Sequence, residues 1–345
     1  MLSIARPQLY DGRMTPLLDL RGLMVELPTP EGWVRPVNGV SLRLEPGSSL
    51  GLVGESGSGK TMLSLAMMGL LPPGARVRGS ALFASSPAHT LDLATLREDD
   101  WIALRGRRIA MVFQEPMTAL NPVMRVGTQI AEAIRAHCPR LGGEALDRAV
   151  REALTRAAVP EPELRARQYP HELSGGLRQR VLIAMALAGD QEARAGSSAE
   201  ARLLIADEPT TALDVTVQKQ ILDLLAQLRR ELGLTLLFIT HDLGVVAQVA
   251  DRVAVLYAGR IVEEGPTAEV LRAARHPYTV GLLRASPRLV RHTVEPIPGA
   301  VPALDALPPG CAFAPRCSLR VDACDAAVPT LRDANPGHQA RCVLV

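Results

Sequence analysis

The sequence predicts an α/β fold with a parallel sheet that is covered on both faces. Short apolar segments typical of strands alternate with helix-length segments along most of the chain. One apolar strand, residues 50–53, leads directly into a glycine-rich loop, and a helix-length apolar run follows that loop. The composition, 47% hydrophobic but only 3% aromatic, indicates a substantial core built mainly of Ala, Leu, Val and Ile.

The bulk properties exclude several classes of protein. A chain of 345 residues has room for about two domains of roughly 150 residues each. Its formal net charge of +2 gives no reason to expect a nucleic-acid partner, which usually requires a strongly basic domain. No run of about 18 apolar residues predicts a membrane span, and the first residues lack the apolar core of a signal peptide. The cytosol is therefore the default compartment, and Met14 is an alternative to Met1 as the start.

The first elements are strands, followed by the loop and a helix. Residues 37–44 alternate with period two, residues 45–47 form a turn, and residues 50–53 are a fully apolar strand. The helix-length run of residues 62–71 ends at a Pro-Pro-Gly stretch. Strand, glycine loop and helix in this order are the context that a phosphate-binding loop requires.

The remaining elements continue the alternation. Residues 109–113 and 203–206 are short buried strands, and residues 124–190 have a helical pattern broken at prolines. Residues 215–232 have the pattern of an amphipathic helix, and residues 234–240 form a further strand. Strands separated by helices favour a parallel sheet.

The glycine loop has the residues that a triphosphate site needs. The stretch GESGSGKT fits the pattern G-x-x-x-x-G-K-[ST]. Its glycines allow successive backbone N–H groups to face phosphate oxygens, beside the positive end of the following helix. Lys60 would neutralise the outer phosphates, and the Thr61 hydroxyl would bind Mg²⁺. A glycine-rich turn without a ligand is the alternative. The nucleotide-binding candidates are Gly54, Glu55, Ser56, Gly57, Ser58, Gly59, Lys60 and Thr61.

Two acids follow the apolar strand of residues 203–206. The strand places Asp207 at the carboxyl edge of the sheet, where it could hold Mg²⁺ through the metal's water shell. Glu208 could orient and deprotonate a water molecule that attacks the γ-phosphate. The alternative is a surface turn with two solvated acids. Together with the glycine loop, these acids predict a nucleoside triphosphatase.

The stretch LSGGLRQR at residues 173–180 narrows the class. With it, the chain resembles the ATP-binding subunits of ABC transporters, whose signature reads LSGGxxQR. The resemblance extends over most of the chain, with the motifs in the family's order. It implies that Gln114 is the Q-loop glutamine and a further Mg²⁺ ligand, that Asp214 belongs to the D-loop, and that His241 is the switch histidine. A kinase or GTPase would leave the LSGG stretch unexplained.

The signature implies an ATP site shared between two chains. Ser174, Gly175 and Gly176 precede a helix expected over residues 178–188, so they form a second anion-binding helix N-terminus. In the family, this N-terminus faces the γ-phosphate of ATP bound to a partner subunit, and Gln179 belongs to the same motif. We therefore expect the chain alone to bind ATP but to hydrolyse it poorly.

For three of the candidate residues, a second interpretation of their role stays open. His241 is expected to contact the γ-phosphate, Glu208 or the attacking water, although a core histidine would fit the same position. Asp214 could instead cap the helix that follows it, and both roles are compatible. Trp33, upstream of the glycine loop, is the candidate for stacking on adenine, with an ordinary loop residue as the alternative.

Several longer stretches resemble the ATPases of oligopeptide and dipeptide importers. They are residues 115–122, 169–176, 207–218, 276–279, 297–302 and 310–317. The resemblance implies an ATPase that energises peptide import from the cytoplasmic face of the cell membrane. Its partners would be a paralogous ATPase subunit, two transmembrane permease subunits and an extracytoplasmic solute-binding protein. Nickel and glutathione importers share this pattern, and a soluble ABC ATPase is a more distant alternative. The cargo and the choice between a homodimer and a heterodimer stay open.

Composition and resemblance together predict two domains. Residues 1–275 are expected to form a RecA-like ABC ATPase domain, with a helical subdomain at about 115–188 that contacts the permeases. Residues 276–345 are expected to form a separate, Pro-rich extension with its own small core. Residues 189–202 are longer than the usual connection in the family, which predicts an exposed loop. Leu177 replaces the methionine usual in the subfamily, a volume-conserving change expected to be silent.

The extension contains four of the five cysteines: Cys311, Cys317, Cys324 and Cys342. In a reducing cytosol, such a group favours metal binding over disulfides. The wide spacing of the four favours a 4Fe–4S cluster over Zn²⁺, which commonly uses closer pairs of ligands. Unpaired thiols in a small core are the alternative.

Overall fold

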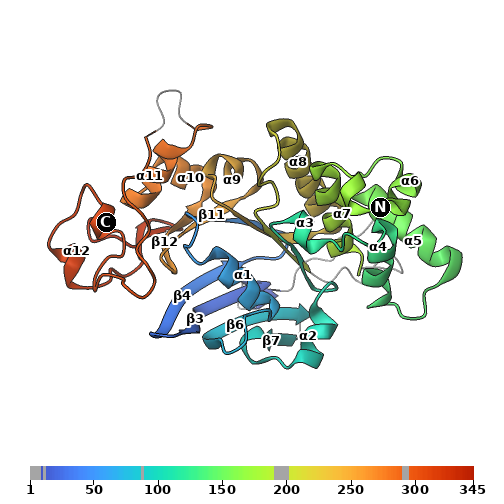
Figure 1. Cartoon of the computed structure of the whole chain (residues 1–345). Helices are drawn as coiled ribbons and strands as arrows, with labels where there is room; N and C mark the ends of the chain where they lie inside the picture. Colours follow the sequence, from blue (N-terminus) through green and yellow to red (C-terminus); the bar gives the residue numbers. More distant parts are fainter. Residues whose placement is uncertain (1–8, 11–12, 87–88, 190–201, 290–294) are drawn as a thin grey trace.

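The structure is a computed structural model that describes residues 9–10, 13–86, 89–189, 202–289 and 295–345 (Figure 1). A central sheet contains the parallel strands β5 (Ser49–Val53), β8 (Ile109–Val112), β9 (Arg202–Asp207), β10 (Leu234–Thr240) and β11 (Arg252–Tyr257). It continues through the antiparallel strands β12 (Arg260–Pro266), β14 (His338–Ala340) and β13 (Arg332–Asn335). The strand order is β13-β14-β12-β11-β5-β10-β9-β8.

The apolar strands predicted from the sequence are confirmed, and their composition follows from burial on both faces. Every residue of β5, β8, β9 and β10 is buried. Within β5, Leu50 and Leu52 pack into one hydrophobic cluster while Val53 packs into the other. Because successive side chains point to opposite faces, a strand covered on both sides needs an apolar residue at nearly every position.

Helices cover one face of the sheet. This face packs against α7 (Gly175–Leu187), α8 (Val215–Leu232) and α9 (Leu243–Val249), while α4 (Val126–Arg135) and α5 (Gly143–Arg156) pack on α7. The shorter helices α3 (Pro116–Ala119) and α6 (Pro162–Arg167) lie beside α4, α5 and α7 (Figure 1). Helix α8 has the predicted bounds, because Asp214 caps its N-terminus and Gly233, with φ of 61°, ends it.

The other face is covered too, as predicted, but by strands as well as a helix. It is covered by α1 (Lys60–Met68) together with a four-stranded antiparallel sheet. The strands of this sheet are β3 (Leu18–Thr29), β4 (Gly32–Leu44), β6 (Arg76–Ser86) and β7 (His89–Asp92), followed by α2 (Glu98–Leu104). Helix α1 ends before the predicted position, because Gly69 adopts a left-handed C-cap with φ of 62°.

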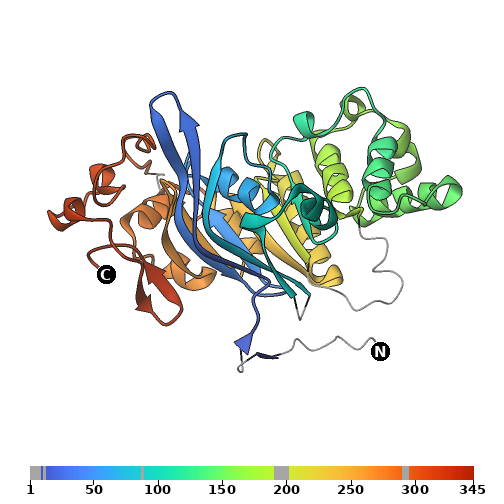
Figure 2. The same cartoon turned by 90° about the horizontal axis from the view of Figure 1, so that it is seen from below.

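The helices around α4 to α6 and the carboxyl-terminal extension lie at opposite ends of the molecule (Figures 1 and 2). The extension begins with α11 (Pro277–Ala285), which follows α10 (Thr267–Arg272), and it includes α12 (Ala323–Ala326). A short pairing of β1 (Leu9–Tyr10) with β2 (Arg13–Met14) precedes the core. The predicted loop of residues 189–202 lies almost entirely outside the described residues.

The extension is joined to the core rather than forming the separate unit expected from its composition. Strand β14 pairs with β12 and so lengthens the central sheet. The buried carboxylate of Glu263 contacts His338 Nε2 at 2.7 Å and accepts the backbone N–H groups of Arg275 and His276 at 2.7 and 2.8 Å. The pairing of β14 with β12 gives hydrogen-bond partners to backbone groups of β12 that would otherwise be unpaired at the edge of the sheet. The division near residue 275 stays a prediction.

Candidate functional site

The glycine loop lies between the end of β5 and the start of α1. Gly59 is the N-cap of α1 with φ of 106°, and a Cβ at this position would lie 1.9 Å from the carbonyl oxygen of Pro36. A Cβ at Gly54 would lie 2.2 Å from the carbonyl oxygen of Leu256. Both positions therefore require glycine, and the close packing holds the loop against β4 and β11.

Lys60 lies inside this loop and is only 6% exposed. Its ammonium group donates hydrogen bonds to the carbonyl oxygens of Gly54 at 2.8 Å and Glu55 at 3.0 Å. Burial lowers the pKa of Lys60, while the negative charges of Glu208, Asp207 and Glu55 oppose that effect. A buried cation beside the positive end of α1 is an arrangement that binds phosphate oxygens.

The carboxylate of Asp207 at the end of β9 fits a magnesium site. Asp207 is 1% exposed, and its Oδ1 atom has no hydrogen-bond partner among the described residues. The other oxygen, Oδ2, lies 3.5 Å from the Ser64 hydroxyl. Burial raises the pKa of Asp207, and its hydrogen bond with Thr61 opposes this shift. An unpaired buried carboxylate oxygen near a threonine hydroxyl suits Mg²⁺, which binds through one or two carboxylates together with phosphates.

Two of the three predicted catalytic residues, Gln114 and His241, contact one carboxylate oxygen of the third, Glu208. Glu208 Oε2 lies 3.4 Å from the amide nitrogen of Gln114 and 3.3 Å from Nδ1 of His241. The Thr211 hydroxyl donates to the same oxygen at 2.8 Å. Glu208 itself has φ of 45°, a left-handed conformation that non-glycine residues adopt at an energetic cost. Sequence reasoning missed Thr211, although its place three residues after Glu208 was visible in the sequence.

The signature residues form a helix N-terminus away from this cluster. The Ser174 hydroxyl accepts a hydrogen bond from the backbone N–H of Leu177 at 3.4 Å, and Gly175 begins α7, earlier than predicted. A Cβ at Gly176 would lie 2.5 Å from Cγ1 of Val217, so α7 and α8 need glycine there to pack closely. No hydrogen bond or ion pair connects residues 174–176 with residues 54–61 in the described part of the chain.

Gln179 is buried in this region, and Asp214 caps a helix there. Gln179 is 1% exposed, and its side-chain nitrogen lacks a partner among the described residues. Asp214 caps α8 by accepting the backbone N–H groups of Thr216 and Val217 at 3.0 and 2.9 Å. The capping interpretation of Asp214 is thus confirmed, while its D-loop role stays a prediction.

Comparison with known proteins gives the family. The family "ABC transporter" matches residues 37–211, and the family "Oligopeptide/dipeptide transporter, C-terminal region" matches residues 262–324. The chain belongs to the ABC transporter family. Its fold is the P-loop ABC ATPase fold, and it is an ATPase of that family.

Relatives and solved structures match nearly the whole ABC cassette. A putative peptide import ATP-binding protein of Brucella melitensis is 51% identical over 338 residues, covering 95% of this chain and 97% of the relative. The oligopeptide transport ATP-binding protein OppD of Salmonella typhimurium is 46% identical over 328 residues, covering 94% and 93%. The dimeric structure of a post-hydrolysis ATP-binding cassette bound to ADP and Pi has a TM-score of 0.61 at 26% identity, covering 72% of this chain and 98% of that one.

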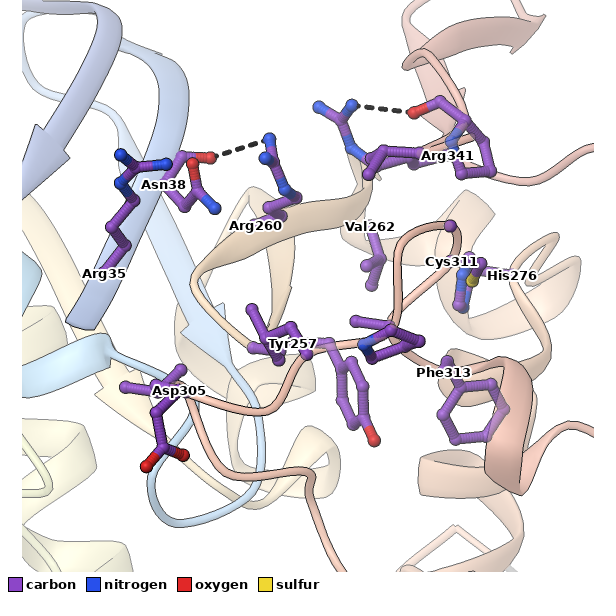
Figure 3. A pocket seen from close by; sticks show the side chains of 18 of the residues that line it. Arg35, Asn38, Tyr257, Arg260, Val262, His276, Asp305, Cys311, Phe313 and Arg341 are labelled. Atoms are coloured by element: carbon purple, nitrogen blue, oxygen red, sulfur yellow. Dashed lines mark hydrogen bonds between the residues drawn. The ribbon is translucent and has the colours of Figure 1, made fainter. Parts of the chain in front are cut away.

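Trp33, the predicted adenine-stacking residue of the ABC ATPase, lies at the start of β4. Its ring is 42% exposed, and the guanidinium carbon of Arg76 lies 3.9 Å from the ring centroid. It lines a pocket of about 390 Å³ between β4, β12 and the extension. Arg260 and Arg341 also line this pocket, where both donate to backbone carbonyls (Figure 3). The pocket has no residue of the glycine loop among its lining residues, so adenine stacking on Trp33 stays a prediction.

The cysteines of the extension are free thiols that influence one another. Burial raises the pKa of Cys311 and Cys317, and the charges of Cys324 and Cys342 raise both further. Within the described residues, however, no three His, Cys, Asp or Glu side chains are arranged to hold a metal ion. The structure therefore does not support the predicted 4Fe–4S cluster or its Zn²⁺ alternative.

The described part of the ABC ATPase includes no helix with the length and apolar character needed to cross a membrane.

The pH dependence of stability tests the contact between Glu208 and His241. Their hydrogen bond raises the pKa of His241 and lowers the pKa of Glu208. The contribution of His241 is complete below its unfolded pKa of about 6.5 and is lost as pH rises through the higher folded pKa. The contribution of Glu208 is lost as pH falls through its lowered folded pKa. We therefore expect His241→Gln to lower the free energy of unfolding more near pH 6 than near pH 9 in urea titrations.

The exposed residue His89 provides the control, because it lies outside the site. His89→Gln should leave the unfolding free energy close to that of the wild type, as replacement of an exposed surface residue usually does. Equal losses for His241→Gln at both pH values would contradict the proposed contact.

Proposed function

We propose that this ABC ATPase energises an importer of oligopeptides or dipeptides. One observation supports the peptide assignment above others: both the cassette and the extension match peptide-importer proteins, over 95% of the chain in the Brucella melitensis relative. The convergence of Gln114 and His241 on Glu208, close to Lys60, supports ATP hydrolysis as the energy source.

We assign the following roles to the site residues. The backbone of residues 54–61 and the ammonium group of Lys60 bind the phosphates of ATP. Thr61 and Asp207 would hold Mg²⁺, with Gln114 as a further ligand, and the ion would neutralise charge on the phosphate oxygens. Glu208 accepts a proton from the attacking water.

Gln114, Thr211 and His241 hold the Glu208 carboxylate in place, since all three contact its Oε2 oxygen. The His241 side chain is 60% exposed, so it would be accessible to a γ-phosphate bound at the site. The strained backbone of Glu208 indicates that its orientation is maintained by these contacts.

The complete site requires a second cassette. Ser174, Gly175 and Gly176 provide a second phosphate-binding helix end, and within the described residues no hydrogen bond or ion pair joins them to the chain's own glycine loop. A partner ATPase would present these residues to ATP bound at residues 54–61, and Gln179 and Asp214 would support that interface. ATP-driven closure of the two cassettes would be transmitted through the helices at about residues 115–188 to two permease subunits. The assembly would sit on the cytoplasmic face of the membrane and receive cargo from an extracytoplasmic binding protein.

Reconstitution with the cognate permeases, partner ATPase and binding protein tests the transport function. We expect peptide-loaded binding protein to stimulate ATP hydrolysis, and the ligand-free protein to stimulate it less. The variant Lys60→Ala provides a background without ATP binding. Stimulation by nickel or glutathione instead of peptides would overturn the peptide assignment and retain the importer. If the chain associates with ribosomes or DNA and not with permeases, the assignment to transport is overturned altogether.

Metal binding by the four cysteines of the extension stays a prediction of this proposal, supported only by Cys324 and Cys342 lying near enough to raise the pKa of Cys311 and Cys317. Iron and acid-labile sulfide in anaerobically purified protein would favour 4Fe–4S, and zinc alone would favour the alternative. We expect replacement of Cys317 by serine to remove the bound metal. Protein without either metal would leave the cysteines as ordinary thiols.

A further inference from the structure

A buried arginine of the extension binds the glycine loop directly. Arg316 belongs to a short 3₁₀ turn, Ala314–Arg316, immediately before Cys317. Its guanidinium group contacts both carboxylate oxygens of Glu55, at 2.7 and 3.0 Å. The Arg316 side chain is 4% exposed, and Glu55 is the second residue of the predicted phosphate loop. Such bidentate, charge-assisted pairs are among the stronger hydrogen bonds in proteins.

The remaining donors of Arg316 are also satisfied. They bond the carbonyl oxygens of Pro298 at 2.8 Å and Ile297 at 3.4 Å, and the Tyr257 hydroxyl at 3.3 Å. The guanidinium carbon lies 5.8 Å from the ring centroid of Phe313. The arginine is thus fixed on every side by the extension and β11, so its position depends on the folded conformation of residues 297–317.

A second contact holds the backbone of the same loop residue. The Tyr278 hydroxyl accepts a hydrogen bond from the backbone N–H of Glu55 at 2.8 Å. Tyr278 is fully buried, and its ring lies 4.5 Å from Tyr257 and 5.4 Å from Phe313, measured between centroids. The extension therefore holds Glu55 at two points, the side chain and the backbone N–H.

Glu55 connects these contacts to the lysine that faces the phosphates. The carbonyl oxygen of Glu55 accepts a hydrogen bond from Lys60 Nζ at 3.0 Å. A shift of the Glu55 peptide would therefore move a partner of that ammonium group. The charge of Glu55 also matters, because an unpaired carboxylate beside a polyphosphate site would repel the nucleotide. Arg316 neutralises that charge while it fixes the loop.

We propose that Arg316 is a positioning residue for nucleotide binding, through which the extension sets the ATP affinity of the glycine loop by pairing with Glu55. This inference rests on the proposed binding of ATP at residues 54–61. It gives the extension a role in the ATP site itself, because a change in the Cys311–Cys317 segment would alter the anchor of the loop. The proposed effect of Arg316 on ATP affinity is mechanical and electrostatic, and it involves no covalent step.

The test measures ATP dissociation constants of the full chain with Mg²⁺, by displacement of a fluorescent ATP analogue. We expect Arg316→Gln to raise the dissociation constant roughly 3- to 30-fold. Arg316→Lys keeps the charge without the bidentate geometry and should lie between the wild type and Arg316→Gln. In the double variant Glu55→Gln/Arg316→Gln the unpaired charge is gone, so most of the lost affinity should return. The turnover number at saturating ATP in the assembled transporter should change far less than the KM for ATP.

The control is Arg320→Gln, which breaks the exposed ion pair with Asp325 in the same extension. It should bind ATP as the wild type does. Thermal unfolding verifies that each variant is folded. If Arg316→Gln does not fold, the ATP dissociation constant of Arg316→Lys is compared with that of Glu55→Gln/Arg316→Lys instead. Unchanged affinity in Arg316→Gln, or a double variant as weak as the single one, would overturn the inference. If the wild type and Arg320→Gln also fail to bind ATP, the proposed function itself fails.

Discussion

Glu208→Gln is expected to reduce ATP hydrolysis by the assembled transporter by roughly 10²- to 10⁴-fold, the range in which a general base contributes. Glutamine has nearly the same shape as glutamate but does not accept the proton of the attacking water. Its side-chain oxygen keeps a position for the hydrogen bonds of Gln114 and Thr211, so the site should keep its geometry. ATP affinity should therefore stay within a few-fold of the wild type. Phosphate release and nucleotide binding are the two measurements.

Glu264→Gln is the matched control for this variant. Glu264 is a largely buried carboxylate in an ion pair with Arg252 at 3.0 Å, and it lies on β12 away from the site. Its replacement should leave hydrolysis unchanged. Hydrolysis at the wild-type rate in Glu208→Gln would show that another group accepts the proton.

Ser174→Arg should have the second large effect, and only in the assembled transporter. The arginine would fill the space in front of the α7 N-terminus and remove the hydroxyl that caps it. Loss of donors that face developing charge on the γ-phosphate typically costs about 10²-fold or more in rate. Hydrolysis should fall accordingly, while the isolated chain should bind ATP normally, because its own glycine loop is intact.

The conservative variant Ser174→Thr separates the two parts of this effect. It keeps a capping hydroxyl and should retain most of the activity. In the Glu208→Gln background, Ser174→Arg should also abolish the two-cassette assembly that ATP induces, as measured by size-exclusion chromatography. Loss of ATP binding by the isolated Ser174→Arg chain would show that Ser174 acts on its own glycine loop, which the shared site does not allow.

The sequence predicted the parts of the molecule that depend on local pattern. The strands β5, β9 and β10 were visible as apolar runs because both faces of the central sheet are covered. The bounds of α8 were visible because an N-cap residue and a glycine mark its ends. The site motifs were visible for the same reason, since a phosphate loop and an acid after a strand are short, continuous segments.

The sequence did not predict that an antiparallel sheet forms part of the layer over the second face of the central sheet. Alternating patterns indicate strands, but they do not say which face of the parallel sheet those strands cover. The extension was likewise expected to stand apart, because its prolines and short segments give little regular pattern. Its attachment depends on the pairing of β14 with β12 and on the buried contact between Glu263 and His338.

By itself, the sequence determined the class of fold, the order of its elements and the residues that could bind and hydrolyse ATP. Only the tertiary structure placed Gln114, Thr211 and His241 around one oxygen of Glu208, and Arg316 on Glu55 across a separation of 261 residues. The physical reason is that period, capping and loop chemistry act between near neighbours in the chain. Contacts between distant segments depend on how the sheet, its covering layers and the extension pack together, which no short stretch of sequence specifies.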